Sequence, residues 1–295
     1  ILQVLGYPAV FLGSSPFIAP SMFHLMSHLD LEDGVLYAEG GFTRVIDSMR
    51  EIIEDHGVTI MTNTRVSAIA TERSGGKAKA TGITYRDAEG HTHTLSADMV
   101  VSTTDLHHSE TKLLPAELQT YPQKWWDKKV AGPSAVLLYL GVKGEVPELL
   151  HHSLFFTEDW DANFSQIFAD KPTVPSPASV YVCKPSATDS SVAPKGHTNL
   201  FFLVPMPADV GLGHGGMDGT GDTEVEVIAD RAIEQVMAWS GATDLAERIV
   251  VRRSVGPADF AGELNAWKGT ALGPAHTLMQ SALFRAGNVS KKVDG

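Results

Sequence analysis

The 295-residue chain contains a single cysteine, Cys183, and no apolar run long enough to form a transmembrane helix. One cysteine cannot form an internal disulfide, and this usage is typical of a reducing, cytoplasmic setting. Residues 136–142 and 200–206 are among the longest apolar stretches, whereas a helix that spans a bilayer needs about 18 or more such residues. We therefore expect neither a disulfide-stabilised secreted domain nor an integral membrane protein.

Basic residues are also scarce, because 23 Lys and Arg stand against 35 Asp and Glu, which gives a formal net charge of -12. Proteins that bind nucleic acids in general neutralise phosphates with clusters of Lys and Arg. The sequence offers only short pairs such as Lys128–Lys129 and Lys291–Lys292, which are typical of solvated surface. The composition is that of a folded globular protein, and nucleic acid is not an expected partner.

Histidines occur without the partners that define the common metal motifs. His24 and His28 have the spacing of two zinc ligands on one helix, but Leu25 stands where the H-E-x-x-H motif needs its glutamate. His107–His108 and His151–His152 lack a cysteine or carboxylate at ligand spacing in the sequence. We therefore predict no metal site.

The chain also lacks a G-x-S-x-G elbow, so hydrolysis by a serine nucleophile is not expected.

A glycine motif at Gly211–Gly216 spells G-x-G-x-x-G, the pattern of dinucleotide-binding loops. In such loops the third glycine lies in the first turn of the helix, so that the helix N-terminus faces the phosphates. Here the expected helix begins later, at Thr223, and Arg252–Arg253 lies where an acidic ribose ligand would be needed. We interpret residues 211–221 as a flexible connection.

Hydrophobic periodicity predicts a mixture of helices and strands, hence an α/β to α+β fold. A short buried helix is expected from Ser21, and a second helix from Phe42 that stops at Gly57. A hairpin turn is expected at 87–90. The predicted strands are 34–37, 58–62, 66–70, 99–102, 135–142, 179–183, 199–205 and 248–255.

The clearest helix signal starts at Thr223, where Thr223 and Glu226 have the spacing of a capping box. The apolar residues that follow share one helical face, and Gly241 comes directly after the expected end. This face is formed by Val225, Ile228, Ala229, Ala232 and Val236.

Aromatic and methionine residues gather near the start of the chain, at Phe11, Phe17, Met22, Phe23 and Met26. Such residues pack in most protein cores. They also suit the wall of a tunnel for a long apolar ligand, which needs apolar area and few polar groups. Both interpretations remain open at this point.

Six segments resemble bacterial phytoene desaturases, which belong to the FAD-dependent, amine-oxidase-like superfamily. The resemblance runs essentially from end to end and is most specific in the last of these segments. The six are 5–17, 34–42, 63–66, 264–269, 271–281 and 284–288. The glycine-rich fingerprint that holds the FAD pyrophosphate in this family, and its closing flavin-contact motif, have no counterpart in residues 1–295. The resemblance therefore implies an internal piece of a longer protein.

The family resemblance also implies a division of the chain. Residues 1–33 would belong to the substrate domain and 34–105 to the middle of the FAD-binding domain. Residues 106–265 would form the substrate-binding domain, built on a mixed β-sheet with flanking helices, and 266–295 would return to the FAD-binding domain.

By similarity, the backbone of Val66 would meet the adenine of FAD, and a run of polar residues would lie near its ribose and phosphates. A third group would lie near the flavin and contain any acid or base. The aromatic and methionine residues named above would then line the substrate tunnel. The polar run is Ser102, Thr103, Thr104 and Asp105, and the group near the flavin is His276, Gln280 and Arg285.

The resemblance implies an enzyme that converts phytoene stepwise to lycopene or a related polyene by hydride transfer to FAD. Because phytoene dissolves in the bilayer, we expect a cytoplasmic protein attached peripherally to a membrane surface. The piece itself is expected to be inactive without the phosphate-binding segment, and no particular oligomeric state is implied. Two alternatives remain: a sister flavoprotein such as a carotenoid isomerase, ketolase or amine oxidase, and a binding module for apolar ligands or membranes without redox chemistry.

Overall fold

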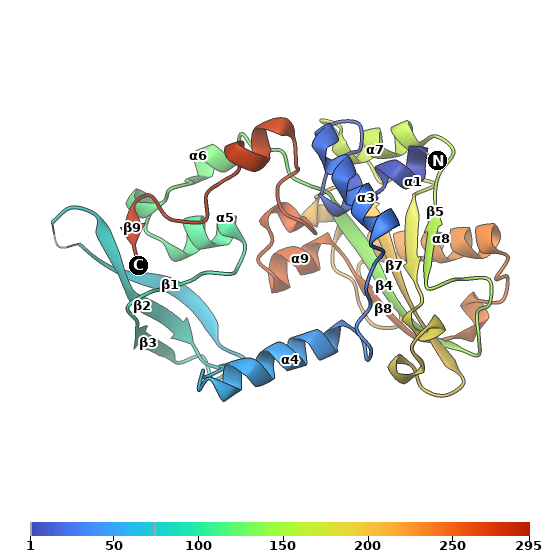
Figure 1. Ribbon diagram of the computed structural model, residues 1–295, viewed down its shortest axis with the longest axis horizontal. Coiled ribbons are helices and arrows are strands. Elements are labelled where there is room, and N and C mark those ends of the chain that lie inside the picture. Colours follow the sequence, from blue (N-terminus) through green and yellow to red (C-terminus); the bar gives the residue numbers. More distant parts are fainter. Residues whose placement is uncertain (1, 74) are drawn as a thin grey trace.

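The computed structural model describes residues 2–73 and 75–295, without the side chains of Ala9, Phe11, His24 and Asp30. Two sheets organise this part of the chain into two lobes (Figure 1). The large lobe contains a five-stranded sheet, and the small lobe a four-stranded one. The predicted mixture of helices and strands is confirmed.

The sheet of the large lobe has the strand order β5-β6-β7-β4-β8, and all its pairings are antiparallel. Side chains alternate along β4, where Val136, Leu138 and Leu140 are buried and Tyr139 is exposed on the other face. The four strands predicted here from sequence are confirmed. The bounds are β4 Ser134–Lys143, β5 His152–Phe155, β6 Val180–Cys183, β7 His197–Met206 and β8 Ile249–Val255.

Helix α8, Thr223–Ser240, supplies most of the second layer of this core. Its predicted apolar face is buried, and the helix ends where expected, because Gly241 adopts the left-handed conformation with φ 85°. A residue without a Cβ takes this conformation without steric strain. The buried face includes Val225, Ile228, Ala229, Ala232 and Val236.

The predicted capping box at the start of α8 is wrong. Asp222 occupies the N-cap position, and the Glu226 carboxylate instead accepts hydrogen bonds from the Ser254 hydroxyl and from the Arg252 guanidinium, the latter at 2.6 Å. Arg252 also pairs with the exposed Asp230 at 2.5 Å. Glu226 is thus used to join α8 to β8, since a buried carboxylate needs charged or polar partners.

The glycine-rich stretch 211–221 packs tightly against the same region. The Gly215 and Gly256 N–H groups donate to one oxygen of Asp259, each at 2.7 Å. A Cβ at Gly215 would lie 2.2 Å from the Ser254 backbone. These glycines allow backbones to approach closely, so residues 213–216 pack against β8 and the start of the segment at 256–259.

The small lobe contains a hairpin sheet that the end of the chain completes. Strands β1, β2 and β3 are antiparallel neighbours with the turn near the predicted position, and β9 pairs with β2 in parallel. Short helices α5 and α6 belong to this lobe (Figure 1). The bounds are β1 Arg65–Arg73, β2 Ala78–Arg86, β3 Thr92–Ser96, β9 Val293–Asp294, α5 Leu106–His108 with a π-turn at Ser109–Leu113, and α6 Gln123–Trp126.

Helix α4, Phe42–Asp55, lies between the lobes (Figure 1) and confirms the second predicted helix. Its apolar residues Phe42, Ile46, Met49 and Ile52 are exposed. The strands predicted at 34–37, 58–62 and 99–102 are absent, because no described strand pairs with these segments. A strand needs a neighbour for its backbone hydrogen bonds as well as an apolar pattern.

The start of the chain forms a helical layer on the large lobe, where α1 Leu2–Gly6, α2 Pro8–Phe11 and α3 His24–Glu32 lie near α7 Trp160–Phe168. Tyr7 and Val10 pack against Trp160 and Phe164. The helix predicted from Ser21 exists as a 3₁₀ turn followed by α3, but the expectation that it is buried is wrong, because Leu25 is 64% exposed.

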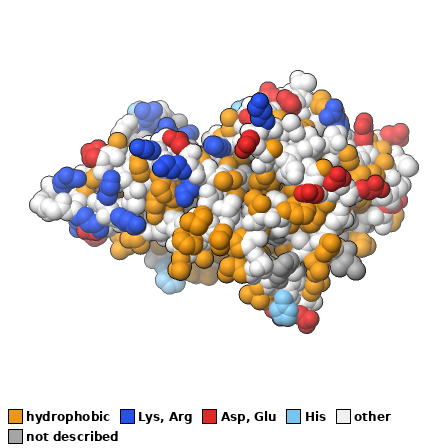
Figure 2. Space-filling view, turned by 90° about the horizontal axis from the view of Figure 1, so that it is seen from above, with side chains coloured by type: hydrophobic (Ala, Val, Ile, Leu, Met, Phe, Trp, Pro, Cys, Tyr) orange, Lys and Arg blue, Asp and Glu red, His pale blue; other side chains and the backbone are white. Residues whose placement is uncertain are grey.

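Charge is unevenly distributed on the face seen in Figure 2. Most side chains coloured blue, Lys and Arg, lie over the small lobe, most of those coloured red, Asp and Glu, lie over the large lobe, and hydrophobic side chains lie between them. None of the described helices has the length and apolar character needed to cross a bilayer.

Replacement of Glu226 by alanine should destabilise the large lobe by about 3 kcal/mol, because it leaves the largely buried Arg252 without its inner partner. Asp230→Asn is the matched control, since it removes the exposed partner of the same arginine and should cost less than about 1 kcal/mol. Urea unfolding followed by circular dichroism measures both. Equal losses in the two variants would contradict the role assigned to Glu226.

Candidate functional site

Two cavities share one wall, which is formed by Ser102, Thr103 and Thr104. The first has a volume of about 910 Å³ and the second about 440 Å³. Both volumes lie in the range of small-molecule and cofactor sites. The shared segment follows β3 of the small sheet and leads into α5, so one short stretch of backbone lines both cavities.

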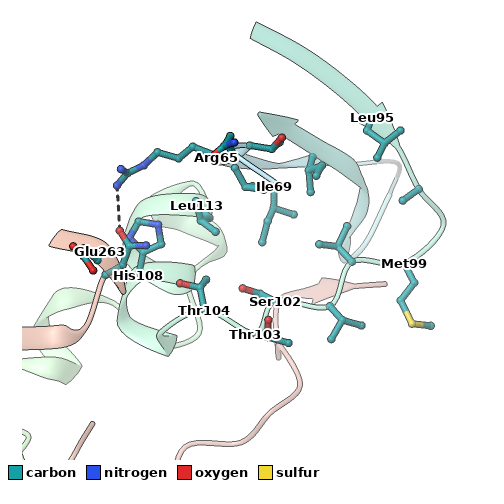
Figure 3. Close-up of a pocket in the computed structure, with 18 of the residues that line it drawn as sticks. Arg65, Ile69, Leu95, Met99, Ser102, Thr103, Thr104, His108, Leu113 and Glu263 are labelled. Atoms are coloured by element: carbon teal, nitrogen blue, oxygen red, sulfur yellow. Dashed lines mark hydrogen bonds between the residues drawn. The ribbon is translucent and has the colours of Figure 1, made fainter. Parts of the chain in front are cut away.

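The first cavity lies beside β1 and contains Val66 in its lining (Figure 3). Ile69 and Leu95 give it an apolar side, whereas Glu263 and Asn265 approach from the end of α9, Pro257–Glu263. The Arg65 guanidinium donates a hydrogen bond of 3.2 Å to the Asn265 side-chain oxygen. This bond joins β1 to a segment 200 residues later in the chain.

Asp105 holds the shared wall in place through both carboxylate oxygens. One oxygen accepts the N–H groups of His107 at 2.8 Å and His108 at 3.3 Å, which caps α5. The other accepts the N–H of Trp267 at 3.2 Å. Because these backbone groups engage both oxygens, Asp105 acts on the cavities by positioning their wall.

Thr104 presents an unusual polar atom at this wall. Its hydroxyl oxygen is buried and has no hydrogen-bond partner among the described residues. Buried hydroxyls are almost always hydrogen-bonded, to protein or to water, because an unpaired one costs about 1–3 kcal/mol. Thr104 lines both cavities, and a rotation about its χ1 bond would be needed to turn this buried hydroxyl towards a polar ligand in one of them.

The second cavity brings together His276, Gln280 and Arg285, the three residues expected near a flavin. The Nδ1 of His276 contacts the Leu12 carbonyl oxygen. Since a carbonyl can only accept, Nδ1 carries the proton, and Nε2 has the free lone pair when the ring is neutral. The ring of Phe23 meets this imidazole edge-on, with centroids 5.8 Å apart.

The amide of Gln280 is fully used in holding the backbone. Its oxygen accepts the Val130 N–H at 2.8 Å, and its nitrogen donates to the carbonyls of Val130 at 3.0 Å and Ala275 at 2.7 Å. This pattern gives Gln280 a structural role. Arg285, in contrast, is exposed and has no salt bridge within the described part of the chain, so its cation can meet an anionic ligand.

The residues expected to form a tunnel wall are less closely grouped. Phe17 packs edge-on against Trp160 at 5.9 Å and is 56% exposed, and Met22 is 63% exposed. Only Phe23, through His276, reaches the second cavity. Met26 is half-buried, and the side chain of Phe11 lies outside the described residues.

Sequence reasoning missed the aromatic side of the second cavity. Trp125 and Trp126 line it, and the Lys129 ammonium lies 4.2 Å from the centroid of the Trp125 ring, a cation–π contact. The tandem tryptophans were a visible signal, since aromatic rings are frequent in ligand sites. The contact between Arg65 and Asn265 had no signal in the sequence, because it depends on the tertiary fold.

Comparison with known proteins gives concordant matches along the chain. Residues 4–248 match a family model described as flavin containing amine oxidoreductase. A carotenoid 3,4-desaturase of Haloarcula japonica is 40% identical over 293 residues, which cover 99% of this chain and 55% of that protein. A phytoene desaturase of Neurospora crassa is 30% identical over 300 residues, covering 99% and 48%. The chain thus spans about half the length of these relatives.

Among solved structures, the crystal structure of an oxidoreductase from Methanosarcina mazei matches with a TM-score of 0.56. The match covers 86% of this chain and 53% of that protein, at 18% sequence identity. At this level of identity the match establishes a shared fold alone.

Asp105→Ala should destabilise the protein by about 1–2 kcal/mol, because it removes the N-cap of α5 and the bond to the Trp267 N–H. Asp98→Ala, on the exposed segment before the shared wall, should change stability by less than about 0.5 kcal/mol. Thermal unfolding of the two variants beside the wild type gives the measurement. A wild-type melting temperature for Asp105→Ala would show that the carboxylate does not hold this wall.

Proposed function

The chain belongs to the family of flavin-containing amine oxidoreductases, and from this premise we propose that it serves in a flavin-dependent carotenoid desaturase. The observation that carries the proposal is the pair of cavities that meet at Ser102–Thr104. One cavity combines an apolar side with polar residues, as an adenine and its ribose would need, and the other has aromatic rings, a histidine and the exposed cation of Arg285. The names of the two relatives, a carotenoid desaturase and a phytoene desaturase, support the substrate class.

The described residues fit a flavin dinucleotide. The buried, unpaired hydroxyl of Thr104 is the strongest sign, because a ribose or phosphate oxygen would satisfy it. We assign the adenine to the backbone around Val66, the ribose and phosphates to Ser102, Thr103 and Thr104, and the positioning of this wall to Asp105. A bound flavin supplies the acceptor for the hydride.

Arg285 and His276 are assigned to the reacting end of the site. Arg285 would place its charge beside anionic groups of the cofactor or of the reduced ring. Desaturation removes a hydride from one carbon and a proton from its neighbour, and the electron pair of the second C–H bond becomes the new double bond. The free Nε2 of His276 is the group that would accept the proton, whereas Gln280 keeps its structural role.

The substrate is assigned as a long apolar polyene. Phytoene, converted in successive steps to lycopene or a related polyene, is the first candidate. The higher identity to a carotenoid 3,4-desaturase than to the phytoene desaturase favours a second candidate, an already conjugated carotenoid desaturated near one end. The Phe23 ring contacts His276, and we assign the exposed or half-buried Phe17, Met22 and Met26 to the path by which the substrate enters. The side chain of Phe11, expected on the same wall, lies outside the described residues.

The start of the chain supports the proposal of a peripheral membrane attachment. Residues 1–29 contain no Asp, Glu, Lys or Arg, and Leu2, Leu25 and Leu29 are exposed. Exposed apolar side chains on a segment without charged residues gain free energy by entering the headgroup region, next to the layer that dissolves the apolar substrate.

The function is tested by incubating the longest natural polypeptide that contains this chain with flavin, an electron acceptor and either phytoene or lycopene in liposomes. Each added double bond lengthens the conjugated system, so chromatography with absorbance detection identifies the products. Conversion of phytoene supports the first candidate, and conversion of lycopene alone supports the second. Failure with both polyenes, together with turnover of an amine, would assign the protein to a different reaction of the family.

Arg285→Met tests the contribution of the Arg285 charge to flavin binding. The substitution keeps the side-chain length and should weaken flavin binding about tenfold or more, because a charge-assisted hydrogen bond contributes about 1.5–3 kcal/mol. Arg73→Met, at the exposed end of β1, is the control and should bind flavin normally. Quenching of flavin fluorescence on titration measures both affinities.

Membrane attachment is tested with Leu25→Glu and Leu29→Glu, which place charge on the exposed side of α3. Each should lower the partition coefficient onto liposomes about tenfold, because a leucine loses about 1.5–3 kcal/mol of apolar burial. Val250→Glu, at an exposed position of β8, should leave it unchanged. Co-sedimentation with phosphatidylcholine vesicles is the measurement, and unchanged binding of all three variants would contradict attachment through this layer.

A further inference from the structure

Three side chains able to bind a metal ion meet at the edge of the large sheet, outside the two cavities. They are His151, His152 and Cys183, and one ligand-capable atom from each lies within 4.8 Å of the others. Antiparallel pairing of β5 with β6 places His152 directly opposite Cys183. His151 precedes β5, and its carbonyl oxygen accepts the N–H of Lys184 at 2.8 Å. The backbone thus fixes all three positions.

Both imidazoles are oriented by hydroxyl groups. The Nδ1 of His151 lies 2.6 Å from the Thr188 hydroxyl oxygen, and the Nδ1 of His152 lies 2.7 Å from the Tyr181 hydroxyl oxygen. When Nδ1 donates its proton to these oxygens, Nε2 of each ring carries the lone pair that a metal needs. Histidines that bind metals almost always have such a hydrogen bond at the other ring nitrogen.

We propose that His151, His152 and Cys183 bind a zinc-type divalent cation, with a fourth coordination position open to water or to a small ligand. Two imidazole nitrogens and one thiolate form a donor set that suits Zn²⁺ and matches the three-ligand sites that keep an open position. The assignment rests on the geometry of this sheet edge and does not depend on the proposed desaturase function.

The observed spacing requires only a small adjustment. Zinc bonds of about 2.0–2.3 Å in tetrahedral geometry place ligand atoms about 3.3–3.8 Å apart, whereas the upper separation here is 4.8 Å. His152 is exposed and His151 lies before the strand begins. Rotation of these two side chains by a modest angle can close the site without moving the backbone of β6.

A bound cation would strengthen a contact between the large lobe and the segment before α4. The ring of Tyr37 meets His151 at a centroid distance of 5.2 Å, and its hydroxyl donates to Asp189 at 3.2 Å. Asp189 also accepts the N–H of Gly40 at 2.7 Å. By fixing His151, the metal would hold this segment on the sheet, so zinc should stabilise the folded protein as any ligand of the native state does.

The experiment is a titration of the reduced, chelator-treated protein with Zn²⁺, followed by isothermal calorimetry, and with Co²⁺, followed by absorbance. We expect one zinc ion per chain and, with Co²⁺, a thiolate-to-metal charge-transfer band in the near ultraviolet. Cys183→Ser should abolish this band and weaken zinc binding by more than about 100-fold. Loss of a residue that only hydrogen-bonds a metal ligand weakens metal binding by about 10–100-fold. Thr188→Val, which removes only the orienting hydroxyl, should weaken it about tenfold.

The matched control is His197→Ala, which removes a histidine at the start of β7 in the same sheet and should leave zinc binding unchanged. His152→Ala is a second test in case Cys183→Ser fails to fold. Because His152 is exposed, its replacement should leave the fold intact, and this variant should also lose tight zinc binding. Zinc should raise the melting temperature of the wild type and of His197→Ala but not of Cys183→Ser. Binding that survives Cys183→Ser, or the absence of any charge-transfer band, would overturn the proposal.

Discussion

The candidate site depends on the backbone hydrogen bonds that the carboxylate of Asp105 accepts. This carboxylate gathers backbone N–H groups from the start of α5 and from Trp267, which lies 162 residues later in the chain. The wall that leads into α5 therefore has a fixed position between two cavities. Because charged hydrogen bonds of this kind are stronger than neutral ones, this side chain reinforces the packing of Trp267 against Trp126 and His107.

The two lobes are stabilised in different ways. The large lobe has a continuous apolar core between its sheet and α8, with Glu226 and Arg252 joining helix to strand. The small lobe has a smaller apolar cluster, and α4 carries an apolar face that no described residue covers. This difference explains why the large lobe could be anticipated well from periodicity. It also places the candidate ligand site where packing is least complete, as is common for sites that bind a large cofactor.

The conformation of a helix or strand was predicted well where residues close to it in the sequence decide that conformation. The buried face of α8 and the left-handed Gly241 follow from spacing and from glycine's lack of a Cβ. Glu226 shows the limit of this reasoning: its spacing from Thr223 indicated a cap, yet its carboxylate lies against Ser254 and Arg252. A local motif fails when a distant cation offers a buried carboxylate a better partner.

By itself, the sequence determined the mixed α/β class, the alternation of β4 and the resemblance that pointed to Ser102–Asp105 and to His276. These features depend on periodicity and on residue type, which are local. Tertiary structure alone decided that segments 58–62 and 99–102 form no strands, that Gln280 clamps Val130, and that Cys183 stands opposite His152. Each of these outcomes depends on which backbone lies alongside, and strand register and hydrogen-bond partners are fixed only when the whole chain packs.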